Sequence, residues 1–71
     1  MIPIVIVAAI NDDLSYPEYF ELCAKDDLIT ETVLRKKEEL EKQGYLYVGY
    51  AHDMHKAQKI ADDYAYKIGF P

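Results

Sequence analysis

The chain has 71 residues, a single cysteine and a formal net charge of −5 at pH 7. This length predicts one domain over residues 1–71, and the lone cysteine excludes a disulfide within the chain and is typical of the reducing, cytoplasmic compartment. The acidic balance argues against nucleic acid as a partner, because binding to a phosphate backbone requires a basic surface.

Residues 2–10 are rich in Ile and Val, which predicts a strand. Both alternating rows of this segment are apolar, a pattern typical of a strand in the middle of a sheet that is covered on both sides. The apolar run is shorter than the roughly 20 residues that span a bilayer, so no membrane partner is expected. Turn-forming residues, with Asp12 and Asp13 among them, predict a loop over 11–17.

The segment 16–24 fits two structures. Ser15 and Glu18 have the spacing of a capping box, which would open a helix here and produce the alternative order β-α-α-β-α. Against this, Phe20 and Leu22 alternate with their neighbours in the period of a half-buried strand. We favour the strand, since three strands form a usable sheet layer and two do not.

A pattern that occurs twice in the chain supports this interpretation. Ala24-Lys25-Asp26-Asp27 and Ala51-His52-Asp53-Met54 each stand where an alternating apolar run is followed by a helical pattern. Each helical pattern then ends at a glycine, Gly44 or Gly69, which is the usual stop for a helix. This repeated pattern predicts helices over 27–43 and 53–68, separated by a strand over 45–51.

The helical spacing also predicts which side chains face inward and which residues cap the helices. The inward residues of the first helix are expected to be Leu28, Ile29, Thr32, Val33, Lys36 and Leu40. Those of the second are expected to be Met54, Ala57, Ile60, Ala61, Tyr64, Ala65 and Ile68. Asp26 or Asp27 is the expected cap of the first helix, and Asp53 that of the second.

These elements predict a small two-layer α+β domain of the split β-α-β type, with the order β-β-α-β-α. The first strand, as the most apolar, is expected at the centre of a three-stranded, mainly antiparallel sheet in the order 2-1-3. Both helices are expected on one face of that sheet, which leaves the other face open.

By alternation, the open face would carry apolar and tyrosine side chains that a lone soluble chain seldom exposes. The expected interface residues are Val5, Val7, Tyr19, Cys23, Tyr45 and Tyr47. Tyrosine is enriched at interface cores, and two-fold homodimers are the commonest oligomers. The pattern therefore predicts a small acidic regulatory module, without catalysis or cofactor, that forms a homodimer or binds a protein partner through this face.

Two alternative functions remain open. His52 and His55, together with Asp12 and Asp13, are residue types that bind metal ions, although capping by Asp53 and solvation of the histidines explain the same residues. The acidic first third of the chain also fits an inhibitor that mimics DNA charge.

Overall fold

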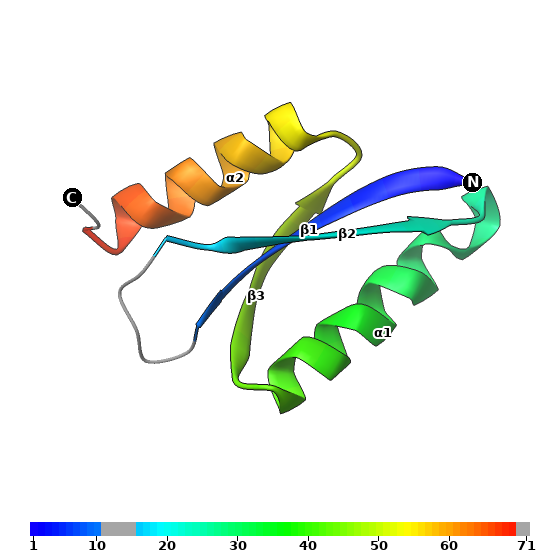
Figure 1. Ribbon diagram of the computed structural model, residues 1–71, viewed down its shortest axis with the longest axis horizontal. Coiled ribbons are helices and arrows are strands. Elements are labelled where there is room, and N and C mark those ends of the chain that lie inside the picture. Colours follow the sequence, from blue (N-terminus) through cyan, green and yellow to red (C-terminus); the bar gives the residue numbers. More distant parts are fainter. Residues whose placement is uncertain (11–15, 70–71) are drawn as a thin grey trace.

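The computed structural model describes residues 1–10 and 16–69, and its elements follow the predicted β-β-α-β-α order (Figure 1). The strands are β1 (Ile2–Ile10), β2 (Glu18–Ala24) and β3 (Tyr45–Ala51), and the helices are α1 (Ile29–Lys42) and α2 (Met54–Lys67). The sheet has the order β2-β1-β3, with β1 antiparallel to both neighbours. The predicted α+β class, element order and strand order are confirmed, and the helical alternative for 16–24 is wrong.

The two helices lie on opposite faces of the sheet, so the prediction that both cover one face is wrong (Figure 1). Even-numbered residues of β1 pack with α1 on the side called here the α1 face; its buried residues are Ile4, Ile6, Ala8, Ala24, Val33 and Leu40. Odd-numbered residues of β1 pack with α2 on the α2 face; its buried residues are Val5, Val7, Ala51, Ala57 and Ala61. The domain therefore has three layers rather than two.

The two apolar rows of β1 account for this arrangement. Ile4 and Ile6 are buried on one face, and Val5 and Val7 are buried on the other. A strand that is apolar on both sides needs a cover on both faces of its sheet, and each helix covers one row. Both apolar rows are thus covered from within the chain.

The start of α1 differs from the prediction. A short 3-10 turn, η1 (Asp26–Leu28), precedes the helix, and among the described residues no side chain caps either element. Leu28, expected to face inward, is 37% exposed. The end of the helix is as predicted, because Gly44 has a φ of +93°, a conformation that glycine adopts without strain.

The start of α2 confirms the prediction, since the Asp53 carboxylate accepts a hydrogen bond of 2.8 Å from the backbone N–H of Lys56. We expect Asp53→Ala to lower the free energy of unfolding by about 1 kcal/mol, because it leaves this N–H without its acceptor. Asp53→Ser retains an acceptor and should cost clearly less. Urea unfolding followed by circular dichroism measures both; equal losses would contradict the capping role.

Candidate functional site

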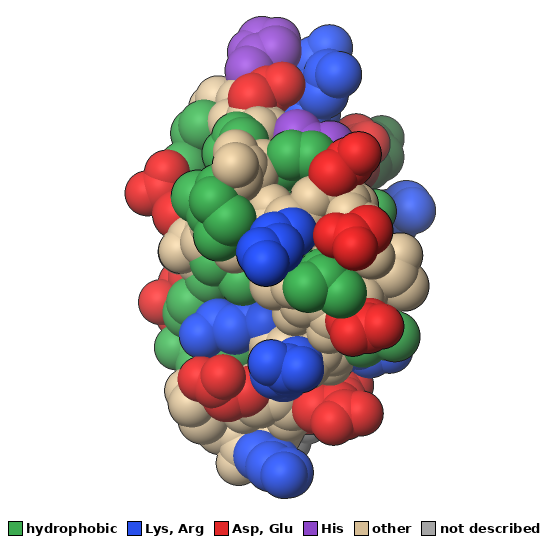
Figure 2. All heavy atoms as spheres, turned by 90° about the vertical axis from the view of Figure 1, so that its right-hand side faces the viewer, with side chains coloured by type: hydrophobic (Ala, Val, Ile, Leu, Met, Phe, Trp, Pro, Cys, Tyr) green, Lys and Arg blue, Asp and Glu red, His purple; other side chains and the backbone are tan. Residues whose placement is uncertain are grey.

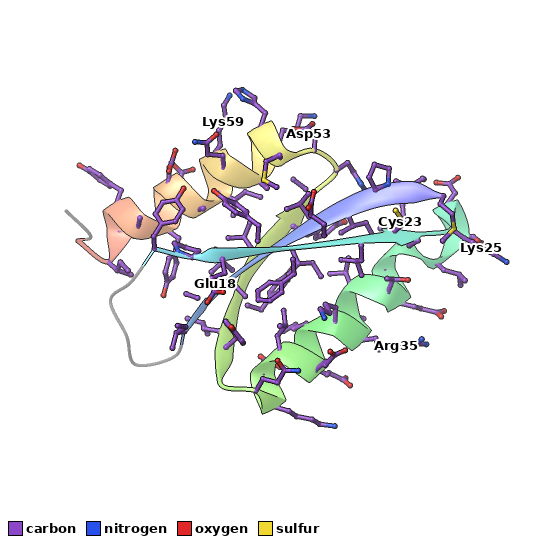
Figure 3. All side chains as sticks on the ribbon, viewed as in Figure 1. Glu18, Cys23, Lys25, Arg35, Asp53 and Lys59 are labelled. Carbon is purple, nitrogen blue, oxygen red and sulfur yellow. The ribbon has the colours of Figure 1, made fainter. Side chains whose placement is uncertain are left out.

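The six residues expected on one open face are divided between the two faces, and most are covered. Val5 and Val7 are 4% and 0% exposed, because α2 packs over them. Tyr19 is half-buried on the same face. Cys23 is exposed near the end of β2, close to Lys25 (Figure 3). The prediction of an open interface is therefore wrong, because these residues do not form one exposed surface. The predicted place of β1 at the centre of the sheet is nevertheless correct.

A β-bulge in β3 turns the other two residues toward α1. Val7 pairs with Gly49 and Ala8 pairs with Tyr47, so Val48 is the extra residue in the ladder. One extra residue inverts the alternation beyond it, and both Tyr45 and Tyr47 pack against the core of the α1 face. The one sequence signal for this bulge is Gly49, since an isolated glycine within a strand pattern suggests one.

Aromatic rings and lysines close much of the α1 face. The rings of Phe20 and Tyr45 meet edge to face with their centroids 5.2 Å apart. The ammonium group of Lys36 lies 5.8 Å from the ring centroid of Phe20. That of Lys37 lies 5.5 Å from the ring centroid of Tyr47. Burial raises the pKa of both tyrosines, since it disfavours the charged phenolate. These tyrosines therefore contribute to packing rather than to an open sheet face.

On the α2 face, a tyrosine hydroxyl connects the segment before β2 to α2. The Tyr16 hydroxyl donates to Oδ1 of Asp62 at 2.6 Å and lies 3.0 Å from the Tyr19 hydroxyl. The hydrogen bond to Asp62, then that to Tyr19, then burial raise the pKa of Tyr16 above its ordinary value. The network holds the residues before β2 against the helix.

This network predicts a pH dependence of stability. The folded-state pKa of Tyr16 lies above the unfolded value of about 10, so its contribution is complete below that pH and is lost as pH rises past it. We expect the free energy of unfolding to fall more steeply above about pH 10 in the wild type than in Tyr16→Phe. Tyr66→Phe is the control, because Tyr66 is 87% exposed. Urea unfolding at a series of pH values measures the slopes; parallel curves for wild type and Tyr16→Phe would contradict the role.

The described residues do not bring the alternative metal ligands together. His52 Nδ1 lies 3.1 Å from the carbonyl oxygen of Pro3, near the start of β1. Asp12 and Asp13 lie outside the described residues, and Ile10, which precedes them, is at the other end of that strand. His55 is exposed on α2. In residues 1–10 and 16–69, no group of three or more His, Cys, Asp or Glu side chains is placed to hold a metal ion.

The surface also bears on the charge-mimic alternative. On the face shown in Figure 2, acidic and basic side chains are interspersed, with hydrophobic side chains between them. A mimic of DNA presents a continuous acidic surface instead, so this face does not favour that function. Across the part of the chain that the structure describes, no helix has the length and apolar character needed to cross a membrane.

The two outer strands differ in how their edges are protected. Nothing within the described ranges pairs with the outer edge of β2 or of β3. β2 carries the exposed glutamates Glu18 and Glu21, and charged side chains are a common means of preventing an edge from pairing with another chain. The sequence of β3, Tyr45–Ala51, contains no charged residue. Apart from the bulge, β3 has no such protection, so it is the edge that charge does not close to another strand.

A groove of about 350 Å³ lies between β3 and α2, along this open edge. Its lining residues are Tyr47, Val48, Ile60, Asp63, Tyr64 and Lys67. A Cβ at Gly49 would lie 3.2 Å from Cγ2 of Ile60, so the glycine allows α2 to approach the strand closely. The floor of the groove is apolar, and its rim carries a carboxylate and an ammonium group.

Of these lining residues, only Tyr47 was among the predicted interface residues. Asp63 and Lys67 carry no sequence signal of their own, since a charged residue on a helix is ordinarily solvated. They become neighbours of Val48 only because α2 covers the second face of the sheet. Comparisons of the chain with models of protein families, with curated proteins and with solved structures find no match, so the function is argued from this groove and its edge strand.

Proposed function

We propose that this protein is a small, non-catalytic binding module that holds an extended segment of a partner protein along the outer edge of β3. The observation that carries the proposal is an uncharged edge strand beside a groove with an apolar floor. An extended peptide that adds to such an edge forms backbone hydrogen bonds with it and places alternate side chains in the adjacent groove. Backbone pairing supplies affinity, and the groove supplies selectivity.

The groove geometry suits this mode of binding. β3 forms one wall and α2 the other, and Val48, the bulged residue, lies at the floor between them. Tyr47 and Tyr64 add large side chains with polar tips, which are favoured at protein interfaces. The predicted role of tyrosines in binding is thus retained in the proposal, but at the margin of the sheet instead of its face.

A segment of another protein fits this edge better than a second copy of the chain. A two-fold pairing of β3 with itself would place the bulge at Val48 twice within a ladder of two seven-residue strands. Two copies would also bring together chains that each carry a net charge of −5, and like charges disfavour association. A flexible partner segment meets the bulge once and adapts its own backbone to it.

A peptide selection tests the proposal. Heptapeptides selected from a random display library on the full chain should protect amides of β3 from hydrogen exchange and leave those of β2 unchanged. Val48→Lys, which places a charge on the open edge, should weaken binding of the selected peptides by more than about tenfold. Glu21→Lys, on the opposite edge, is the matched control and should bind as the wild type does.

Circular dichroism establishes that both variants are folded before binding is measured. Protection of β2 in place of β3, or full binding by Val48→Lys, would contradict the proposal. So would a dimer in sedimentation that protects β3 without any peptide, because a second copy would then occupy the edge.

A further inference from the structure

The groove has a direction, set by the way α2 runs along β3. Ile60 lies against Gly49, near the end of the strand, whereas Tyr64 and Lys67 line the groove together with Tyr47, near its start. The helix is therefore antiparallel to the strand, as Figure 1 also shows. A peptide that pairs with β3 in the slightly more stable antiparallel sense would place its C-terminal end beside Lys67.

The chemistry of the α2 wall changes along this direction. Ile60 offers an apolar surface, Asp63 a carboxylate and Lys67 an ammonium group. Among the described residues, one ion pair is found, between Lys36 Nζ and Glu39 Oε1 of α1 at 3.3 Å. Asp63 and Lys67, one turn apart on α2, form no ion pair within 4 Å with each other or with another described residue, so both groups are available to a ligand.

The spacing of these three residues matches an extended chain. Each step from Ile60 to Asp63 and on to Lys67 is about one helical turn, which is about 5.4 Å along the axis. Side chains on one face of a strand recur every second residue, about 6.6 Å apart. Three successive same-face side chains of a bound peptide can therefore each lie opposite one of the three helical residues.

Resting on the proposed function, we infer that the groove selects an extended segment with an apolar, a basic and an acidic side chain at alternate positions, in N-to-C order. The apolar side chain packs over Val48 and Ile60. The basic one lies opposite Asp63, and the acidic one lies opposite Lys67. The partner segment is thus an amphipathic strand whose charges are ordered, not simply a basic peptide.

Two heptapeptides with the same composition test this inference by NMR titration of the full chain. In one, valine, lysine and aspartate occupy alternate positions among threonines; in the other, lysine and aspartate are exchanged. We expect the first peptide to bind about tenfold more tightly at low salt, since two exposed ion pairs are replaced by two like-charge contacts. The difference should disappear near 1 M salt, where exposed charges are screened.

A charge-exchanged variant makes the test reciprocal. Asp63→Lys combined with Lys67→Asp should reverse the preference between the two peptides, while Arg35→Asp, at an exposed position on α1 (Figure 3), should leave it unchanged. Equal affinity of both peptides for the wild type, with shifts at β3, would overturn this inference and leave the proposed function intact. Shifts confined to residues outside β3 and α2 would overturn the proposed function itself.

Discussion

Val7→Lys is expected to unfold the domain. Val7 is completely buried, in a cluster with Ala57 and Ala61 of α2. An ammonium group placed there without a partner costs several kcal/mol. A domain of this size has only about 5 kcal/mol of net stability to lose. Far-UV circular dichroism and the dispersion of amide resonances measure the outcome.

Cys23→Lys is the matched control for this experiment. Cys23 pairs with Pro3 and so lies on the same face of the sheet as Val7, but it is exposed, whereas α2 covers Val7. We expect this variant to remain folded with a free energy of unfolding within about 0.5 kcal/mol of the wild type. A folded Val7→Lys variant would contradict the covered α2 face and restore the open face that the alternation alone predicts.

Leu40→Ala should lower the free energy of unfolding by about 3 kcal/mol, because it deletes a buried side chain and leaves a cavity between α1 and the sheet. Leu40 is 1% exposed and belongs to the cluster that contains Ile4 and Ile6. In a small domain, a loss of this size removes most of the net stability. Urea unfolding at constant temperature measures it, provided that the transition is two-state.

Leu34→Ala, on the same helix, is the control for this second experiment. Leu34 is 52% exposed, so its truncation should change the free energy of unfolding by no more than about 0.5 kcal/mol. The pair separates the contribution of burial from that of helix propensity, since both substitutions replace leucine by alanine within α1. Similar losses for the two variants would mean that α1 does not pack on the sheet through Leu40.

The proposed binding edge and the predicted open face differ in their physical basis. An open sheet face attracts a partner through apolar area, which here is already covered by α2 over Val5 and Val7. An open strand edge attracts a partner through backbone hydrogen bonds, and β3 retains such an edge. The edge proposal therefore does not need any core residue of this chain to be exposed, and the ordered charges of Asp63 and Lys67 give it a selectivity that can be measured.

The amino-acid sequence by itself determined the elements, their order, and the central place of the first strand. Alternation, helical period, the cap at Asp53 and the stop at Gly44 are set by residues close together in the chain, and so they can be recognised locally. Two apolar rows in residues 2–10 were enough to place that strand between two neighbours. The order β2-β1-β3 followed from these observations.

Only the tertiary structure decided which face each helix covers and where a binding groove lies. The face of α2 depends on its packing against side chains of β1 and β3 in the assembled sheet, which no single segment encodes. The orientation of Tyr45 and Tyr47 depends on a bulge at Val48, which shifts the register between strands far apart in sequence. The groove exists because both conditions hold at once, since side chains from β3 and α2 become neighbours only when the long-range packing is complete.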